Sequence, residues 1–121
     1  MGVVYYGHYL TYYEVARVES LRNLNIAYKD IEKSGIMMPV LTNESKYIRP
    51  AFYDDLISME VRIEEMPDTR ITFHYTFFNE NAKVIHKGKT QLAFVDVSTN
   101  KPVKVPEYIT KVLQPFFNNE N

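Results

Sequence analysis

Between residues 57 and 95 the sequence alternates apolar and polar residues in successive segments. Ile57–Glu64 and Arg70–Phe77 each place apolar side chains at every second position. A period of two puts alternate side chains on opposite faces of a sheet, so both segments predict half-buried strands with one wet face. Lys83–Val95 predicts a third strand, in which Gly88 marks a bulge or a point of close approach. A short strand is also expected at Val103–Val105, after a turn.

The remaining segments have a helical period. Tyr9–Leu24 contains neither Gly nor Pro and predicts a long helix that stops near Asn25. A shorter helix is expected from Tyr28 to Ser34, with Gly35 in a left-handed cap. Pro106 suits the first turn of a terminal helix. The stripe that recurs at three- and four-residue spacing in the long helix is Leu10, Tyr13, Arg17, Leu21 and Leu24, and the apolar stripe of the terminal helix is Ile109, Val112, Leu113 and Phe116.

One long helix followed by consecutive antiparallel strands predicts a single α+β domain over residues 1–121. The chain has 14 Lys and Arg against 15 Asp and Glu, so it lacks the basic surplus that nucleic-acid binding needs. It has no cysteine, which excludes disulfides, thiolate zinc sites and a cysteine nucleophile.

No apolar run is long enough to span a membrane, and the N-terminus is not typical of a signal peptide. A cytoplasmic location is therefore expected. An aromatic-rich sheet with one main helix leaves apolar surface to cover, which favours an oligomer.

Common motifs for phosphate loops, nucleophilic serines and metal-binding histidines are absent, so chemistry would depend on carboxylates, hydroxyls and backbone N–H groups. The segment from Gly2 to Tyr9 leads directly into the long helix, whose start offers free N–H donors and the positive end of the helix dipole. Gly2 and Gly7 would let a ligand approach the backbone, or they simply turn the chain. Glu14 is a candidate base, a partner of Arg17, or a structural carboxylate.

The other polar residues have alternative interpretations. His8 would contact substrate or cap the helix, whereas His74 is expected on the surface and His86 in the core or an interface. Pro50 ends a strand or marks an edge, and Asp54–Asp55 are expected in a turn. Five cationic residues on the strands would either contact the phosphates of a nucleotide-bearing ligand or simply be solvated charges on the faces of the sheet: Arg49, Arg62, Arg70, Lys87 and Lys89.

Together these pieces resemble the 4-hydroxybenzoyl-CoA thioesterase family of the hotdog superfamily, particularly its bacterial short acyl-CoA thioesterases. The matching segments are Gly2–Tyr6 through Tyr9–Leu10, Tyr13–Arg17, Tyr47–Asp55, Gly88–Asp96 and the Pro102 to Pro106 ending. The resemblance implies a hotdog fold, in which an antiparallel sheet wraps a long helix. It also implies a homodimer or homotetramer that hydrolyses an acyl-CoA to free acid and CoA, without a metal or an organic cofactor.

The resemblance also implies roles for single residues. The backbone N–H of Tyr6 matches the oxyanion donor, and Glu14 matches a helix carboxylate that is the fallback base. Members of the family carry a catalytic Asp just before the glycine that matches Gly2, preceded by a first strand, so we expect the chain to extend upstream of Met1. The implied substrate contacts are Gly2, Val3, His8 and Tyr9, and the implied CoA contacts are Arg49, Arg70 and Lys89.

Two rival functions remain at this point. A non-catalytic hotdog module that binds acyl-CoA would need no upstream Asp. A hotdog dehydratase would need a histidine and a carboxylate together, but His8 and Glu14 are six residues apart and do not share a helix face.

Overall fold

The computed structural model describes residues 6–52 and 56–117, with side chains from Tyr9 onward. The helices are α1 (Tyr6–Asn23), α2 (Tyr28–Lys33) and α3 (Glu107–Leu113), followed by a short 3-10 helix (Gln114–Phe116). The strands are β1 (Ile36–Met37), β2 (Val40–Tyr47), β3 (Ser58–Arg62), β4 (Arg70–Phe78), β5 (Val84–Ala93) and β6 (Val95–Asp96).

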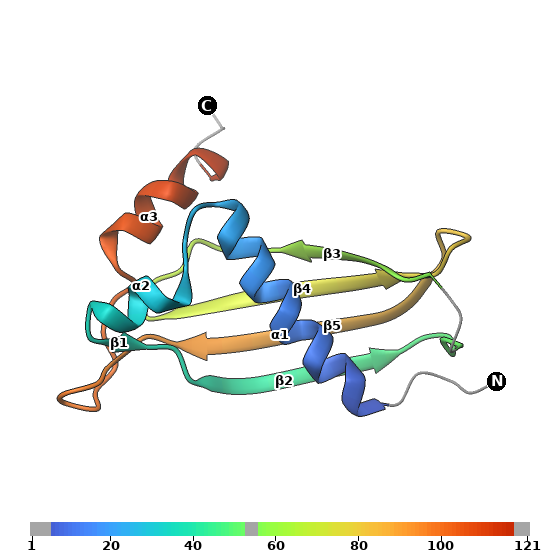
Figure 1. The fold of residues 1–121 in the computed structure, drawn as a ribbon, viewed down its shortest axis with the longest axis horizontal. Coiled ribbons are helices and arrows are strands. Elements are labelled where there is room, and N and C mark those ends of the chain that lie inside the picture. The colour runs from blue at the N-terminus through green and yellow to red at the C-terminus, as the bar shows by residue number, and fades with distance from the viewer. Residues whose placement is uncertain (1–5, 53–55, 118–121) are drawn as a thin grey trace.

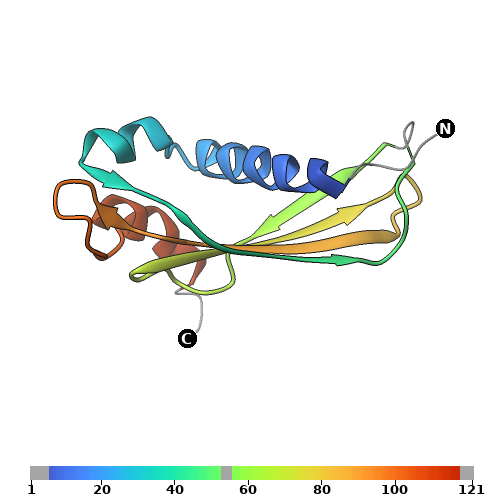
Figure 2. The same cartoon turned by 90° about the horizontal axis from the view of Figure 1, so that it is seen from below.

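The main sheet has the order β2-β5-β4-β3, and all its pairs are antiparallel. Strands β3, β4 and β5 form the predicted meander, while β1 pairs with β6 in a separate small ribbon. Helix α1 crosses the main sheet diagonally (Figure 1), and the view from below shows it lying along one face (Figure 2). The predicted α+β architecture, a long helix on an antiparallel sheet, is confirmed.

Alternation along β4 determines which face of the sheet is buried. Phe73, Tyr75 and Phe77 are at most 1% exposed and point toward α1. Thr72 and His74, which flank Phe73 in sequence, lie on the opposite face. The core therefore fills the layer between α1 and the sheet, as the period of two predicts.

Helix α1 differs from its predicted form at its beginning and in its buried stripe. It begins three residues before Tyr9 and ends at Asn23, two residues before Asn25, which adopts φ 63° and turns the chain. Leu10, expected in the stripe, is 51% exposed, and Tyr9 is buried in its place. The sequence did not determine which side of the helix faces the core, because tyrosines occupy several neighbouring positions around its first two turns. Gly35 does adopt the expected left-handed conformation, with φ 87°.

Three further predictions need correction. Val103–Val105 is not a strand, because in the described chain its bonds go to separate partners: Val103 N–H bonds Phe94 C=O and Val105 N–H bonds Asp68 C=O, while the neighbouring Pro102 makes an isolated bridge to Val95. Phe116 is 63% exposed because α3 ends at Leu113 and a 3-10 turn rotates the later residues off its stripe. The full length of β2 was not predicted, since its residues are exposed on both faces and do not alternate.

Candidate active site

The start of α1 is the first component of the candidate site. Tyr6 is the first residue of the helix, so its backbone N–H belongs to the initial turn, whose N–H groups have no partner within the helix. Partial positive charge gathers at this end, which suits a developing oxyanion. The predicted contacts Gly2 and Val3, together with Asp54–Asp55, lie outside the described residues. The same holds for the side chain of His8.

Tyr9, a predicted substrate contact, lies in the core of the described chain. It is 3% exposed and stacks on the His86 imidazole, with ring centroids 3.6 Å apart and planes 4° from parallel. Its ring also meets Tyr47 and Phe77 edge-on. Tyr9 therefore anchors the first turn of α1 to β2, β4 and β5.

His86 is completely buried, as expected for a core histidine, but only one of its nitrogens is satisfied. Its Nε2 hydrogen-bonds the hydroxyl of Tyr13, which also lies 2.6 Å from Ser45 Oγ. The other nitrogen, Nδ1, is buried without a hydrogen-bond partner among the described residues. Burial lowers the pKa of His86 to about 4, so the imidazole is neutral at neutral pH.

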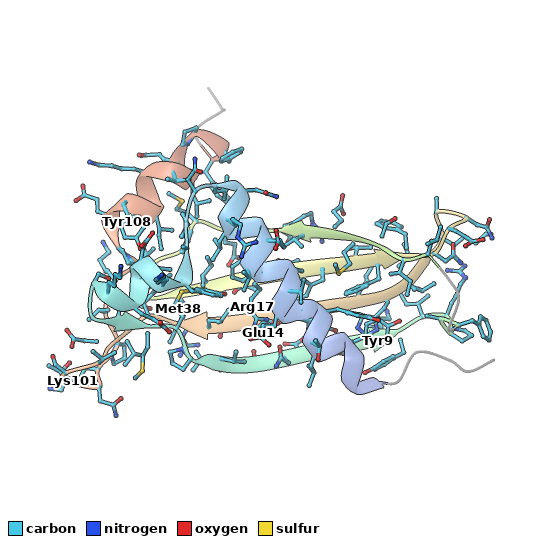
Figure 3. All side chains as sticks on the ribbon, viewed as in Figure 1. Tyr9, Glu14, Arg17, Met38, Lys101 and Tyr108 are labelled. Carbon is cyan, nitrogen blue, oxygen red and sulfur yellow. The ribbon has the colours of Figure 1, made fainter. Side chains whose placement is uncertain are left out.

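Glu14 and Arg17 lie further along α1 than Tyr9 (Figure 3). Glu14 is exposed, whereas Arg17 is only 8% exposed. The two form no ion pair, although both are described residues. Arg17 Nη1 instead donates to the Tyr75 hydroxyl at 3.1 Å and to Thr90 Oγ1 at 3.4 Å. The partnership considered for Glu14 with Arg17 is therefore wrong, because the guanidinium turns into the core.

The three predicted CoA contacts are spread along the sheet. Arg49 Nη1 donates to the Val84 carbonyl at 2.6 Å, and its backbone N–H bonds to Ile85. Arg70 pairs with Ala93 at the other end of β5 and donates to Gln91. Ile85 and Ala93 are eight residues apart on β5, which corresponds to about 26 Å at 3.3 Å per residue. Within one chain the structure does not bring Arg49 and Arg70 together, and Lys89 lies midway between them.

Lys89 lines a hollow of about 300 Å³ on the sheet face opposite α1. Two cations that sequence reasoning did not single out as a pair, Lys46 and Lys87, also line it and are direct register partners. Like charges placed opposite each other repel, which an anion between them would relieve. Lys89 itself pairs with Glu44 at 3.7 Å. The sequence indicated that Lys87 and Lys89 lie on the same polar face of β5. It could not indicate that Lys46 lies opposite Lys87, because that depends on the register between β2 and β5.

A second concavity of about 700 Å³ lies between the C-terminal half of α1, β3 and the C-terminal helices. Its walls include Ala16, Leu24, Val61, Leu113 and Phe117, so it is largely apolar. Arg62 is the one candidate among the described residues that lines it. Within the described part of the chain, no cluster of three metal-ligating side chains occurs and no helix is long and apolar enough to cross a membrane.

Comparison with known proteins places this architecture in a family. The chain is 32% identical over 109 residues to the acyl-CoA thioesterase YbgC of Haemophilus influenzae, covering 89% of this chain and 79% of that protein. It is 31% identical to the DHNA-CoA thioesterase of Staphylococcus aureus, whose crystal structure superposes with a TM-score of 0.84 over 97% of this chain and 78% of the other. The 1,4-dihydroxy-2-naphthoyl-CoA thioesterase of Synechocystis, at 18% identity, shares the fold with a TM-score of 0.87 over 97% of this chain and 87% of the other. Residues 1–113 match the thioesterase-like superfamily, and the chain belongs to that superfamily.

Proposed function

We propose that this protein hydrolyses an acyl-CoA thioester to a free acid and CoA. The observation that carries the proposal is its similarity, at 31–32% identity over most of the chain, to two enzymes named as CoA-thioester hydrolases. Within the superfamily we propose membership of the 4-hydroxybenzoyl-CoA thioesterase family, as a bacterial short acyl-CoA thioesterase that acts in the cytoplasm.

The proposed chemistry uses the start of α1 as the oxyanion site. A water oxygen attacks the thioester carbonyl carbon, and the carbonyl oxygen takes up negative charge beside the Tyr6 N–H. Collapse of the tetrahedral intermediate then breaks the C–S bond, and the CoA thiolate leaves. A carboxylate orients the water and accepts its proton. Removing one oxyanion donor typically costs about 10²- to 10³-fold in kcat, so this N–H matters.

The position of Glu14 limits which carboxylate can serve. Eight residues separate it from Tyr6, about 12 Å along the axis at 1.5 Å per residue. A carboxylate at that distance cannot reach a water attacking a carbonyl held at the Tyr6 N–H of the same chain. Glu14 would therefore act as base only if a second copy brought it to the site, and we propose that the preferred carboxylate is the Asp that the resemblance implies.

CoA phosphates are proposed to bind the cationic hollow around Lys89. Lys46 and Lys87 stand opposite each other there, and the hollow is open to solvent. Phosphate oxygens would form charge-assisted hydrogen bonds with these ammonium groups. Arg49 and Arg70, at the two ends of the sheet, would contribute only to ligands or copies that reach those ends.

A second copy of the chain is proposed to pair along β2. This strand is an edge of the described sheet and all eight of its residues are exposed. Val40, Leu41 and Tyr47 expose 43–48% of their surface, an unusual apolar content for an uncovered edge. Antiparallel pairing of two β2 strands would satisfy a two-fold axis and give the homodimer or, with a second interface, the homotetramer.

The test is release of CoA from a panel of acyl-CoA esters, followed with a colorimetric thiol reagent. Because the protein has no cysteine, it contributes no background signal. Turnover above the buffer rate is expected from a version that carries the implied Asp before Gly2, and only slow turnover from residues 1–121 alone. Binding of the ester without turnover in both would favour a non-catalytic module. Glu14→Gln should retain turnover, like its matched control Glu19→Gln at another exposed position of α1. Loss of turnover in a folded Glu14→Gln variant alone would make Glu14 the base.

A further inference from the structure

A buried hydrogen-bonded linkage ties the first two turns of α1 to the middle of the sheet. The Tyr13 hydroxyl bonds His86 Nε2 on β5 and lies 2.6 Å from Ser45 Oγ on β2. Tyr9, one turn earlier, stacks on the same imidazole. A single side chain of the sheet therefore contacts α1 at two successive turns.

Gly88 makes room for this linkage. It lies opposite Ser45 on β2 and opposite Tyr75 on β4. A Cβ atom at position 88 would collide with the hydroxyl and ring of Tyr13. The close approach expected for this glycine is confirmed, and it is what lets the phenol reach both partners.

The surroundings of His86 suit a geometric role better than proton transfer. The groups that face it are Tyr9 and Tyr13 from α1, Tyr47 from β2 and Phe77 from β4. None of them is charged at neutral pH, and the imidazole has no exposed surface. Burying His86 Nδ1 without a hydrogen-bond partner among the described residues lowers the free energy of unfolding, so an apolar residue in this position would destabilise the fold less. What the imidazole adds is a directional bond to α1.

We infer that His86, acting through Tyr13 and Ser45, is a positioning residue for the start of α1. The inference rests on the proposed function, because it treats the Tyr6 N–H as the oxyanion donor. Tyr6 precedes Tyr9 by about 4.5 Å along the helix axis, so a shift of the first turn moves the donor with it. A misplacement of about 1 Å at a reacting centre can cost 10²-fold in rate.

The experiment compares two buried tyrosines that each lose only a hydroxyl. Tyr13 and Tyr75 stack on each other, with ring centroids 4.4 Å apart, but the Tyr75 hydroxyl is bonded by Arg17 instead of His86. Tyr13→Phe is expected to lower kcat for acyl-CoA at least about tenfold with KM changed less than about threefold. The control Tyr75→Phe is expected to keep kcat within about twofold.

Ser45→Ala breaks the same linkage from its exposed end and replaces Tyr13→Phe should that variant not fold. It is expected to lower kcat in the same direction, and the double variant should be no worse than Tyr13→Phe alone, because both changes remove one network. Equal loss of kcat in Tyr13→Phe and Tyr75→Phe would overturn the inference, as it would indicate general loosening of the core.

Failure of the proposed function has a different signature. If the protein releases no CoA from any ester even when it carries the implied Asp before Gly2, thioester hydrolysis is refuted, and positioning is then judged by amide hydrogen exchange in the first two turns of α1. Faster exchange of the Tyr9 to Tyr13 amides in Tyr13→Phe, but not in Tyr75→Phe, supports the positioning role. Equal exchange in the two variants contradicts it.

Discussion

Acidification from about pH 7 to about pH 5 is expected to lower the free energy of unfolding by about 2 kcal/mol through His86 alone. Burial lowers the pKa of this imidazole from 6.5 to about 4. Between those two values the unfolded chain binds a proton on His86 and the folded chain does not, so stability falls as the pH drops through that window. The loss levels off below about pH 4 at about 3 kcal/mol, since one pKa unit corresponds to about 1.4 kcal/mol.

Urea unfolding at three pH values and one fixed protein concentration measures this effect. His86→Phe keeps a ring for Tyr9 to stack on but removes the titrating group, so its stability should change little over the same window. His74→Gln is the control for removal of a histidine, because His74 lies on the opposite face of the sheet, and this variant should keep the loss of stability that depends on His86.

The two carboxylates with lowered pKa values, Glu64 and Asp96, add little to the change in stability between about pH 7 and about pH 5. The hydrogen bond from Arg62 lowers the pKa of Glu64, and hydrogen bonds from Ser98 lower that of Asp96. Their contributions are present above their ordinary pKa values and are lost only as the pH falls further, below the range of the experiment. An identical pH dependence for the unaltered protein and His86→Phe would refute the reasoning.

Three further predictions concern the packing, the cations and the edge of the sheet. Gly88→Ala should lower stability by about 1–3 kcal/mol in urea unfolding, because its Cβ meets buried Tyr13, and an unchanged urea midpoint would refute this close contact. Lys89→Ala should raise KM for CoA esters about tenfold or more but spare short thioesters that lack the nucleotide, with Lys83→Ala as control; equal effects on both substrates would refute the CoA contact. Leu41→Lys on β2 should shift sedimentation toward monomer, whereas an unchanged oligomer would exclude pairing along this edge.

Residue patterns predicted those elements whose two faces differ. Strand β4 alternates because one face meets α1 and the other does not. Strand β3 alternates in sequence, although only its last two residues, Val61 and Arg62, are partly buried. Strand β2 lacks that signal, since both faces of Val40–Tyr47 are exposed. Asn25 and Gly35 were predictable because left-handed backbone favours Asn and Gly.

The candidate site was predictable only where it is local in sequence. The start of α1 was located within three residues because glycines and a helical period mark it. The His86 linkage was not foreseen, because Tyr13 and His86 are 73 residues apart and only the strand register brings them together. For the same reason, the opposition of Lys46 and Lys87 followed from the structure and not from the pattern.

The pairing of β2 with β5 has a consequence for how the chain folds. The meander from β3 to β5 joins neighbours through short turns, but Tyr47 must meet His86 across 39 residues, and α1 must dock across a longer span. Closing such loops costs entropy before their contacts repay it, so distant pairings slow folding. We expect the meander to form first, leaving one edge of β5 uncovered until β2 and α1 arrive. During that interval the nascent chain is most exposed to pairing with the wrong strand.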